Sequence, residues 1–267
     1  MVQFPKHKQV MTNFISSLRS EIQKLRIRSF KRHTKFTTNY PGFSCTVPDK
    51  SSFLFMYEEI FEKEIYKFTT QNKTPLIIDC GANIGLSAIY FNRLFPQAEI
   101  LAFEPDPIIF EILENNVLKA NADKKIKCIQ ACLSDTVGEV NFYPDGADGG
   151  TISYADKNIK AVKVPAVLLG DYIKKPVDFL KIDIEGAEYD VLDSIVNKLD
   201  MVKNIFIEYH SFVDQPQQFG EILDILKKSG FRYYIEHIGI RSKKPYLHRN
   251  EDHGMDMQIN IYGYRAG

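Results

Sequence analysis

The chain has 267 residues, of which 44% are hydrophobic and 25% charged, and its formal net charge is zero. This length suits one large domain, and the composition is that of an ordinary globular protein. A net charge of zero removes the global electrostatic argument for nucleic-acid binding. No apolar run reaches the roughly 18 residues that a membrane-spanning helix needs.

Cysteine spacing and the first residues give further expectations. The four cysteines form no C-x-x-C pair, and three of them lie in or next to expected core strands. Reduced thiols in a cytoplasmic protein are the simplest interpretation. The first 20 residues contain lysines but no continuous apolar segment, so we expect no signal peptide.

Positive charge is concentrated at the N-terminus, where residues 1–35 hold nine Lys or Arg and one acid. Apolar residues recur there at helical spacing, which predicts a basic amphipathic helix: Val10, Phe14, Leu18, Ile22 and Leu25. We expect its apolar side to pack on the main domain or on a second subunit. Contact with a membrane surface or an acidic partner is the alternative. The chain thus divides into an N-terminal extension, 1–56, and a main domain, 57–267.

Beyond an irregular or hairpin-like segment, 36–56, helices and strands alternate. The expected strands are 76–80, 99–103, 127–133, 177–182, 204–209, 231–237 and 257–262. The expected helices are 57–68, 84–94, 107–120, 187–196 and 219–229. This alternation predicts a parallel sheet with helices on both faces, and the last two strands, joined without a helix, should form an antiparallel edge. Two β segments, 138–143 and 160–164, flank a glycine-rich loop, 145–151.

The most informative segment runs from Leu76 to Gly85 and reads LIIDCGANIG. An apolar run ends in Asp79 and Cys80, and two glycines and an amphipathic segment follow, which predicts a buried strand, a tight turn and a helix. The next apolar run ends in Glu104, where doubly wound folds typically hold ribose hydroxyls. We therefore expect the first half of the chain to bind a ribose-containing ligand.

The glycine spacing discriminates among ribose ligands. Neither the G-x-G-x-x-G dinucleotide fingerprint nor the lysine of a P-loop is present. One acid before the turn and another after the next strand suit a cationic, phosphate-free ligand. S-adenosylmethionine fits, because it carries a ribose and an ammonium group. An ordinary strand–helix turn that needed glycine, or a dinucleotide oxidoreductase, is the alternative.

Four acids and a histidine are expected at the carboxyl ends of two neighbouring strands: Asp183, Glu185, Glu188, Glu208 and His210. Ligands of open α/β sheets bind at those ends, so these side chains should converge beside the ligand. Crowded carboxylates raise one another's pKa, which produces a base able to take a proton from a hydroxyl. Alternatively, Lys181 only pairs with an acid and Glu188 only caps a helix. The acids could also hold Mg²⁺ or Ca²⁺, although the sequence alone assigns no metal site.

Three segments in this order resemble the FkbM family of S-adenosylmethionine-dependent methyltransferases: 79–85, 102–107 and 180–188. The run KIDIEGAE, which begins at Lys181, is the strongest mark of the resemblance. The resemblance implies the class I methyltransferase fold, a Rossmann-like, doubly wound α/β fold. Its sheet has seven strands with an antiparallel last strand, and an N-terminal helical extension would precede it here. The resemblance also implies O-methylation, often of sugar or natural-product hydroxyls.

The family's roles can be carried over residue by residue. The glycine turn would hold the methionine part of the cofactor, Glu104 the ribose, and Ser134 and Asp135 would lie near adenine. The implied cofactor set is Asp79, Gly81, Ala82, Asn83, Gly85, Ser87, Glu104, Pro105, Ser134, Asp135 and Asp183. The implied catalytic set is Asp183, Glu185, Glu208 and His210. The implied substrate set is Lys181, Glu185, Glu188, Tyr209 and His210.

We therefore expect an S-adenosylmethionine-dependent O-methyltransferase that acts on a sugar, glycan or natural product. N- or carboxyl-methylation with the same cofactor, or a non-catalytic cofactor-binding scaffold, is the alternative. Acceptor specificity should reside in the N-terminal segment, the 145–155 loop and the chain after residue 210. We expect no nucleic-acid partner, and the sequence leaves a homo-oligomer open.

Overall fold

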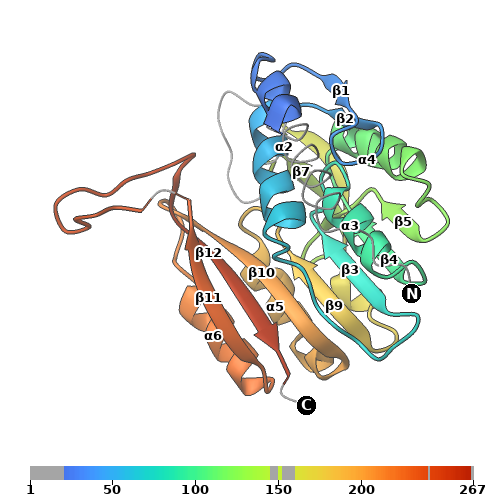
Figure 1. Ribbon diagram of the computed structural model, residues 1–267. Coiled ribbons are helices and arrows are strands. Elements are labelled where there is room, and N and C mark those ends of the chain that lie inside the picture. Colours follow the sequence, from blue (N-terminus) through green and yellow to red (C-terminus); the bar gives the residue numbers. More distant parts are fainter. Residues whose placement is uncertain (1–20, 145–149, 152–159, 240, 266–267) are drawn as a thin grey trace, which may run out of the picture.

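The computed structural model describes residues 21–144, 150–151, 160–239 and 241–265. Its centre is a seven-stranded sheet in the order β11-β12-β10-β9-β3-β4-β5 (Figure 1). These strands are β3 Leu76–Cys80, β4 Glu99–Phe103, β5 Ile126–Ile129, β9 Val177–Ile182, β10 Val202–Phe212, β11 Arg232–Ile238 and β12 Met255–Tyr264. The predicted α/β fold with seven strands and an antiparallel last strand is confirmed.

The reversed strand does not lie at the edge of the sheet. β12 runs antiparallel to both neighbours, β10 and β11, whereas the pairs among β3, β4, β5, β9 and β10 are parallel. We expected β11 and β12 to form an antiparallel edge, and they do pair antiparallel. β11 takes the edge, where most of its side chains are exposed, while Ile259, Asn260 and Ile261 of β12 are buried.

Helices cover both faces of the sheet and form two hydrophobic clusters with it. One face packs against α2 Lys50–Tyr57, α3 Leu86–Leu94 and α4 Pro107–Lys119. The other packs against α5 Glu188–Ser194, α6 Phe219–Lys228 and the 3₁₀ turns Leu169–Asp171 and Val196–Met201. Because strand side chains alternate, Ile77 of β3 joins the first cluster and Ile78 joins the second.

The segment before β3 is more regular than its sequence indicates. β1 Phe36–Thr38 and β2 Cys45–Val47 form the expected hairpin. We expected the next helix at 57–68, but α2 begins at Lys50 and continues as a π-helical turn through Glu62. The helix begins there because the buried carboxylate of Asp49 accepts hydrogen bonds from the backbone N–H groups of Ser51 and Ser52. The division at residue 56 stays a prediction, and side chains from both sides of it share one hydrophobic cluster.

The sequence predicted the start of α4 correctly and the third strand less accurately. Asp106 accepts from the backbone N–H groups of Ile108 and Ile109, with Pro107 in the first turn, as the sequence predicts. The expected strand 127–133 is split between two sheets. Its second half, β6 Cys132–Leu133, pairs with β8 Val162–Val167, which also pairs with β7 Gly138–Phe142. Residues 145–149 of the glycine-rich loop lie outside the described residues.

Only the end of the basic N-terminal helix falls in the described part, as a helix over 21–28. Ile27 is buried there, but Ile22 and Leu25 of the predicted apolar stripe are 57% and 60% exposed, so they do not pack on the domain. The rest of the stripe lies outside the described residues: Val10, Phe14 and Leu18. Among the residues that the structure describes, no helix is both long and apolar enough to cross a membrane.

Candidate active site

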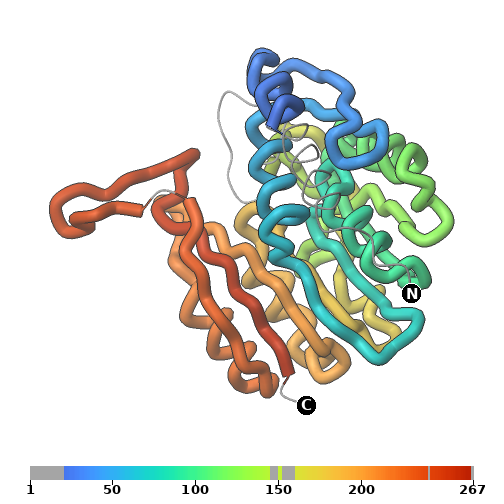
Figure 2. Tube along the Cα trace, in the orientation of Figure 1, coloured from blue at the N-terminus to red at the C-terminus, as the bar shows by residue number. Residues whose placement is uncertain are grey.

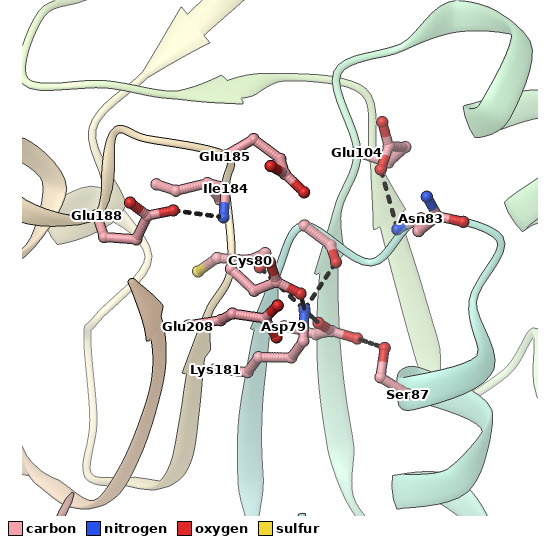
Figure 3. A network of polar contacts seen from close by, with 12 residues as sticks. Asp79, Cys80, Asn83, Ser87, Glu104, Lys181, Ile184, Glu185, Glu188 and Glu208 are labelled. Atoms are coloured by element: carbon pink, nitrogen blue, oxygen red, sulfur yellow. Dashed lines mark hydrogen bonds and ion pairs between the residues drawn. The ribbon is translucent and has the colours of Figure 1, made fainter. Parts of the chain in front are cut away.

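A pocket opens at the carboxyl ends of β3, β4, β9 and β10, on the face of the sheet that α2 and α3 cover. Figure 3 shows the acids that project there from these strands and the turns after them. Most of the predicted site residues line it: Gly81, Ala82, Asn83, Ser87, Glu104, Pro105, Lys181, Asp183, Glu185 and Glu208. The structure therefore brings these segments together at one pocket.

The glycine turn is required by the packing of the two central strands. Gly81 has a φ of +81°, and a Cβ added to it would lie 1.8 Å from the carbonyl oxygen of Asp183. Gly85 has a φ of +89°, and a Cβ there would lie 2.7 Å from Leu113 of α4. Both positions need glycine, the first because the tips of β3 and β9 almost touch.

Buried charges tie the same two strand tips together. The Asp79 carboxylate is fully buried, accepts a hydrogen bond of 2.5 Å from the Ser87 hydroxyl, and lies 3.4 Å from the ammonium of Lys181. Lys181 in turn lies 3.0 Å from Asp183 and donates to the carbonyl of Gly81 at 2.8 Å. The ammonium of Lys181 thus contacts two carboxylates and a carbonyl of the protein itself. This agrees with the alternative that Lys181 pairs with an acid.

Glu104 lies at the tip of β4, and each of its carboxylate oxygens accepts one backbone hydrogen bond. The N–H groups of Asn83 and Asp106 donate to them, both at 2.9 Å. Each oxygen retains a second lone pair for another donor, such as a ribose hydroxyl. Burial raises the pKa of Glu104 to about 8, although the two backbone hydrogen bonds oppose the shift.

His210 lies among three carboxylates. Its Nδ1 is 2.9 Å from Oε1 of Glu188, and its Nε2 is 3.6 Å from Glu185 Oε2 and 3.6 Å from Glu208 Oε1. Glu188 is itself fixed, because the backbone N–H groups of Ile184 and Gly186 donate to the same oxygen. Glu188 therefore orients the imidazole so that Nε2 faces the two pocket carboxylates.

The same cluster has strongly perturbed proton affinities. Burial raises the pKa of Glu185 well above its usual range, and the neighbouring carboxylates of Asp183 and Glu208 add to the shift. Burial lowers the pKa of His210, but the charges of Glu185 and Glu188 outweigh it and raise that pKa well above its usual range. The cluster therefore retains protons near neutral pH and can exchange them with a ligand.

Three predicted residues lie away from this pocket. Ser134 and Asp135 line a separate hollow with Gly186 and Ala187. Tyr209 lies on the opposite face of the sheet from Glu208 and His210, because side chains alternate along β10. Its hydroxyl accepts a hydrogen bond from the Gln218 N–H at 2.8 Å, and its ring stacks on Phe219. The structure therefore does not bring Tyr209 to the expected substrate position.

Sequence reasoning did not single out several residues that line the pocket. Phe55, Met56, Tyr66, Gln258 and Asn260 all do so. Gln258 of β12 donates from Nε2 to Glu208 Oε1 at 2.5 Å and lies 3.2 Å from His210 Nε2. These residues belong to no motif, and only the fold places them here.

The site also contains a possible set of metal ligands. One ligand atom from each of Asp183, Glu185 and His210 lies within 4.8 Å of the other two. The residue types suit a hard divalent cation, but the ammonium of Lys181, 3.0 Å from Asp183, already supplies positive charge there. The sequence assigned no metal site, and metal binding stays the uncommitted alternative.

Comparisons with known proteins agree with this geometry. The chain is 32% identical over 190 residues to methyltransferase sdnD of Sordaria araneosa, covering 58% of this chain and 73% of that protein. It is 30% identical over 155 residues to the hexuronic acid methyltransferase AglP of Haloferax volcanii, covering 57% and 62%. It is 26% identical over 178 residues to the 2-O-methyltransferase NoeI of Sinorhizobium fredii, covering 57% and 71%. The methyltransferase FkbM domain model matches residues 79–233, more than half of the chain, and the protein is thus a methyltransferase of the FkbM family.

Proposed function

We propose that the protein is an S-adenosylmethionine-dependent O-methyltransferase whose acceptor is a hydroxyl of a carbohydrate or natural product. One observation carries this proposal. The strand–glycine-turn–helix unit and Glu104 line one part of a pocket. Glu185 and Glu208, which both lie 3.6 Å from the buried His210, line the same pocket. A cofactor-binding region and a group able to accept a proton thus share one cavity.

Three acidic residues fit the cofactor. Glu104 offers a free lone pair on each oxygen to ribose hydroxyls. Asp183 lines the pocket with a side chain that is 24% exposed, so its carboxylate can receive an ammonium group. Asp79, fully buried behind Ser87, contributes negative charge without direct contact. S-adenosylmethionine, when bound, would supply a methyl group activated by a sulfonium.

The chain's own contribution to the reaction is to orient the acceptor and to remove its proton. A neutral hydroxyl is a poor nucleophile, so it needs a base within hydrogen-bond reach. Glu185 and Glu208 line the pocket, and both lie 3.6 Å from His210 Nε2. Either carboxylate can take the proton and share it with the imidazole, which Glu188 holds in place through Nδ1.

The acceptor class rests on the names of the relatives and on the outer lining of the pocket. One relative is named for a hexuronic acid and another for 2-O-methylation. Phe55 of α2 lines the pocket and is 50% exposed, so its ring is available to stack on a sugar. The polar side chains of Gln258 and Asn260 line the same cavity and offer hydrogen bonds to hydroxyl groups.

Two experiments test the proposal. The first is calorimetric titration with S-adenosylmethionine and S-adenosylhomocysteine, with NAD as the control. We expect both adenosyl ligands to bind and NAD not to bind. The second is incubation with a panel of sugars and hydroxylated natural products, followed by mass spectrometry and NMR of the product. A product methylated on nitrogen or on a carboxylate would contradict O-methylation, and NAD binding without binding of the adenosyl ligands would contradict the cofactor.

A further inference from the structure

The segment between β11 and β12 projects away from the rest of the molecule. Figure 2 shows it as an extended loop that reaches beyond the sheet. Its tip is held in a turn by its own hydrogen bonds. The N–H groups of Leu247 and His248 donate to the carbonyl of Lys244 at 2.9 and 2.8 Å, and the Ser242 hydroxyl donates to the carbonyl of His248.

This turn exposes two large side chains of apolar character. Tyr246 is 99% exposed and Leu247 is 71% exposed. Four basic residues surround them, all of them exposed: Arg241, Lys243, Lys244 and Arg249. No acid occurs from residue 241 to residue 250, and none of the four cations has an ion pair among the described residues.

We propose that the loop over 241–249 docks on a surface of anionic phospholipid. An aromatic ring with a polar hydroxyl and an adjacent leucine suit the boundary between headgroups and acyl chains. Basic side chains around them match the negative potential of anionic headgroups. The turn thus combines basic side chains with exposed apolar ones, and stable attachment to a membrane needs both kinds of contact.

The position of the loop relates this surface to the pocket. β11 ends at Ile238 and β12 reaches Gln258 and Asn260, and all three residues line the pocket. A loop docked on lipid would therefore bring the adjoining edge of the pocket toward the bilayer. The docking itself does not depend on the proposed methyl transfer, so it can be measured without cofactor or acceptor.

The test is sedimentation of the full chain with phosphatidylcholine vesicles, with and without phosphatidylglycerol. We expect binding only to the anionic vesicles, and weaker binding at high salt. The double substitution Lys243→Gln/Lys244→Gln should weaken binding by about 30-fold, from the typical contribution of two basic residues. Lys124→Gln/Lys125→Gln is the matched control, because it removes equal charge directly before β5, at the opposite edge of the sheet. The control should bind as the wild type does.

Fluorescence provides an independent readout, because the chain contains no tryptophan. Tyr246→Trp should show a blue shift on addition of anionic vesicles, whereas Tyr234→Trp, at a position 69% exposed on β11, should show none. The absence of wild-type binding would overturn the proposal, as would unchanged binding by the Lys243/Lys244 variant. The second result would assign the membrane contact to another basic segment, such as residues 1–35.

Discussion

Replacement of Gly81 by alanine tests whether the glycine turn is set by the contact between two strand tips. The added Cβ would lie 1.8 Å from the carbonyl oxygen of Asp183, and real Cβ contacts essentially never fall under 3.0 Å. The tips of β3 and β9 would therefore have to separate by at least 1.2 Å, the difference between these two distances. Gly42→Ala is a matched control, since its φ of +83° is nearly the same and its nearest neighbour is 3.6 Å away.

The expected loss of unfolding free energy follows from the hydrogen bonds that separation of the two strand tips would strain. Both alanines bear the cost of the left-handed conformation, about 1–2 kcal/mol. Gly81→Ala alone also strains the hydrogen bonds from the Asp183 N–H to the Cys80 carbonyl, 3.2 Å, and from Lys181 to the Gly81 carbonyl, 2.8 Å. Loss of one neutral and one charged hydrogen bond adds roughly 2–4 kcal/mol. Gly81→Ala should thus lose about 2–4 kcal/mol more unfolding free energy than Gly42→Ala.

The assay is urea unfolding of both variants, followed by calorimetric titration with S-adenosylmethionine. Gly42→Ala should bind the cofactor as the wild type does, while Gly81→Ala should bind it at least tenfold more weakly, since about 1.4 kcal/mol corresponds to a factor of ten. Equal unfolding free energies for the two variants, together with normal cofactor binding by Gly81→Ala, would refute the reasoning.

Three further predictions follow from the buried acids. Glu188→Gln keeps a hydrogen-bond acceptor for His210 but removes the negative charge of the carboxylate. We expect kcat to fall by about 10–100-fold, with KM for the cofactor unchanged. Because the Glu188 charge raises the pKa of His210, the pH–rate profile should also move to lower pH, and an unchanged profile would contradict this role. Asp49→Ala removes a helix cap and should cost about 0.5–2 kcal/mol in a denaturant titration at pH 7. Burial raises the pKa of Asp49, but hydrogen bonds from the His33 and Ser52 N–H groups and from Arg32 outweigh it and lower the pKa to about 2. The loss in Asp49→Ala should therefore be complete above about pH 4 and shrink as the pH falls through about 2. Finally, cofactor binding should release protons, which titrations in buffers of different ionisation enthalpy would detect.

The features that the sequence predicted best depend on neighbouring residues alone. Asp106 and Pro107 predict the start of α4 because a cap needs only the next turn of the helix. Asp79 and Glu104 could be placed at strand tips because each comes at the end of an apolar run and just before a turn. The missing helix between the last two strands predicted that they pair antiparallel, and the FkbM resemblance added that the last strand is reversed in a seven-stranded sheet.

The remainder of the site depends on contacts that are distant in the sequence. The register of β10 against β12 sets Glu208 opposite Asn260 and His210 opposite Gln258, and neither pair has a local signal. The same limit applies to α2, whose residue Phe55 reaches the pocket only because the helix packs over the end of the sheet. The error at Tyr209 was avoidable, because strict alternation along β10 excludes it from the face of Glu208 and His210.

The predicted proton release follows from an excess of acids over cations in the pocket. Asp183, Glu185 and Glu208 line it, and the buried cations beside them are Lys181 and His210. Burial is the largest cause that raises the pKa of Glu185 and of Glu208, as it is for Glu104. The ligand-free protein therefore reduces its buried negative charge by retaining protons.

A bound cation would take the place of those protons. Positive charge from a bound sulfonium would favour the ionised form of Glu185 or Glu208 and lower its pKa, so the proton would leave to solvent. Either carboxylate would then be the base for the acceptor hydroxyl. S-adenosylhomocysteine lacks the sulfonium charge, so it should release fewer protons than S-adenosylmethionine. Equal release by the two ligands would place the titrating group at Glu104 rather than in the carboxylate–histidine cluster, and would contradict a base that the cofactor's charge prepares.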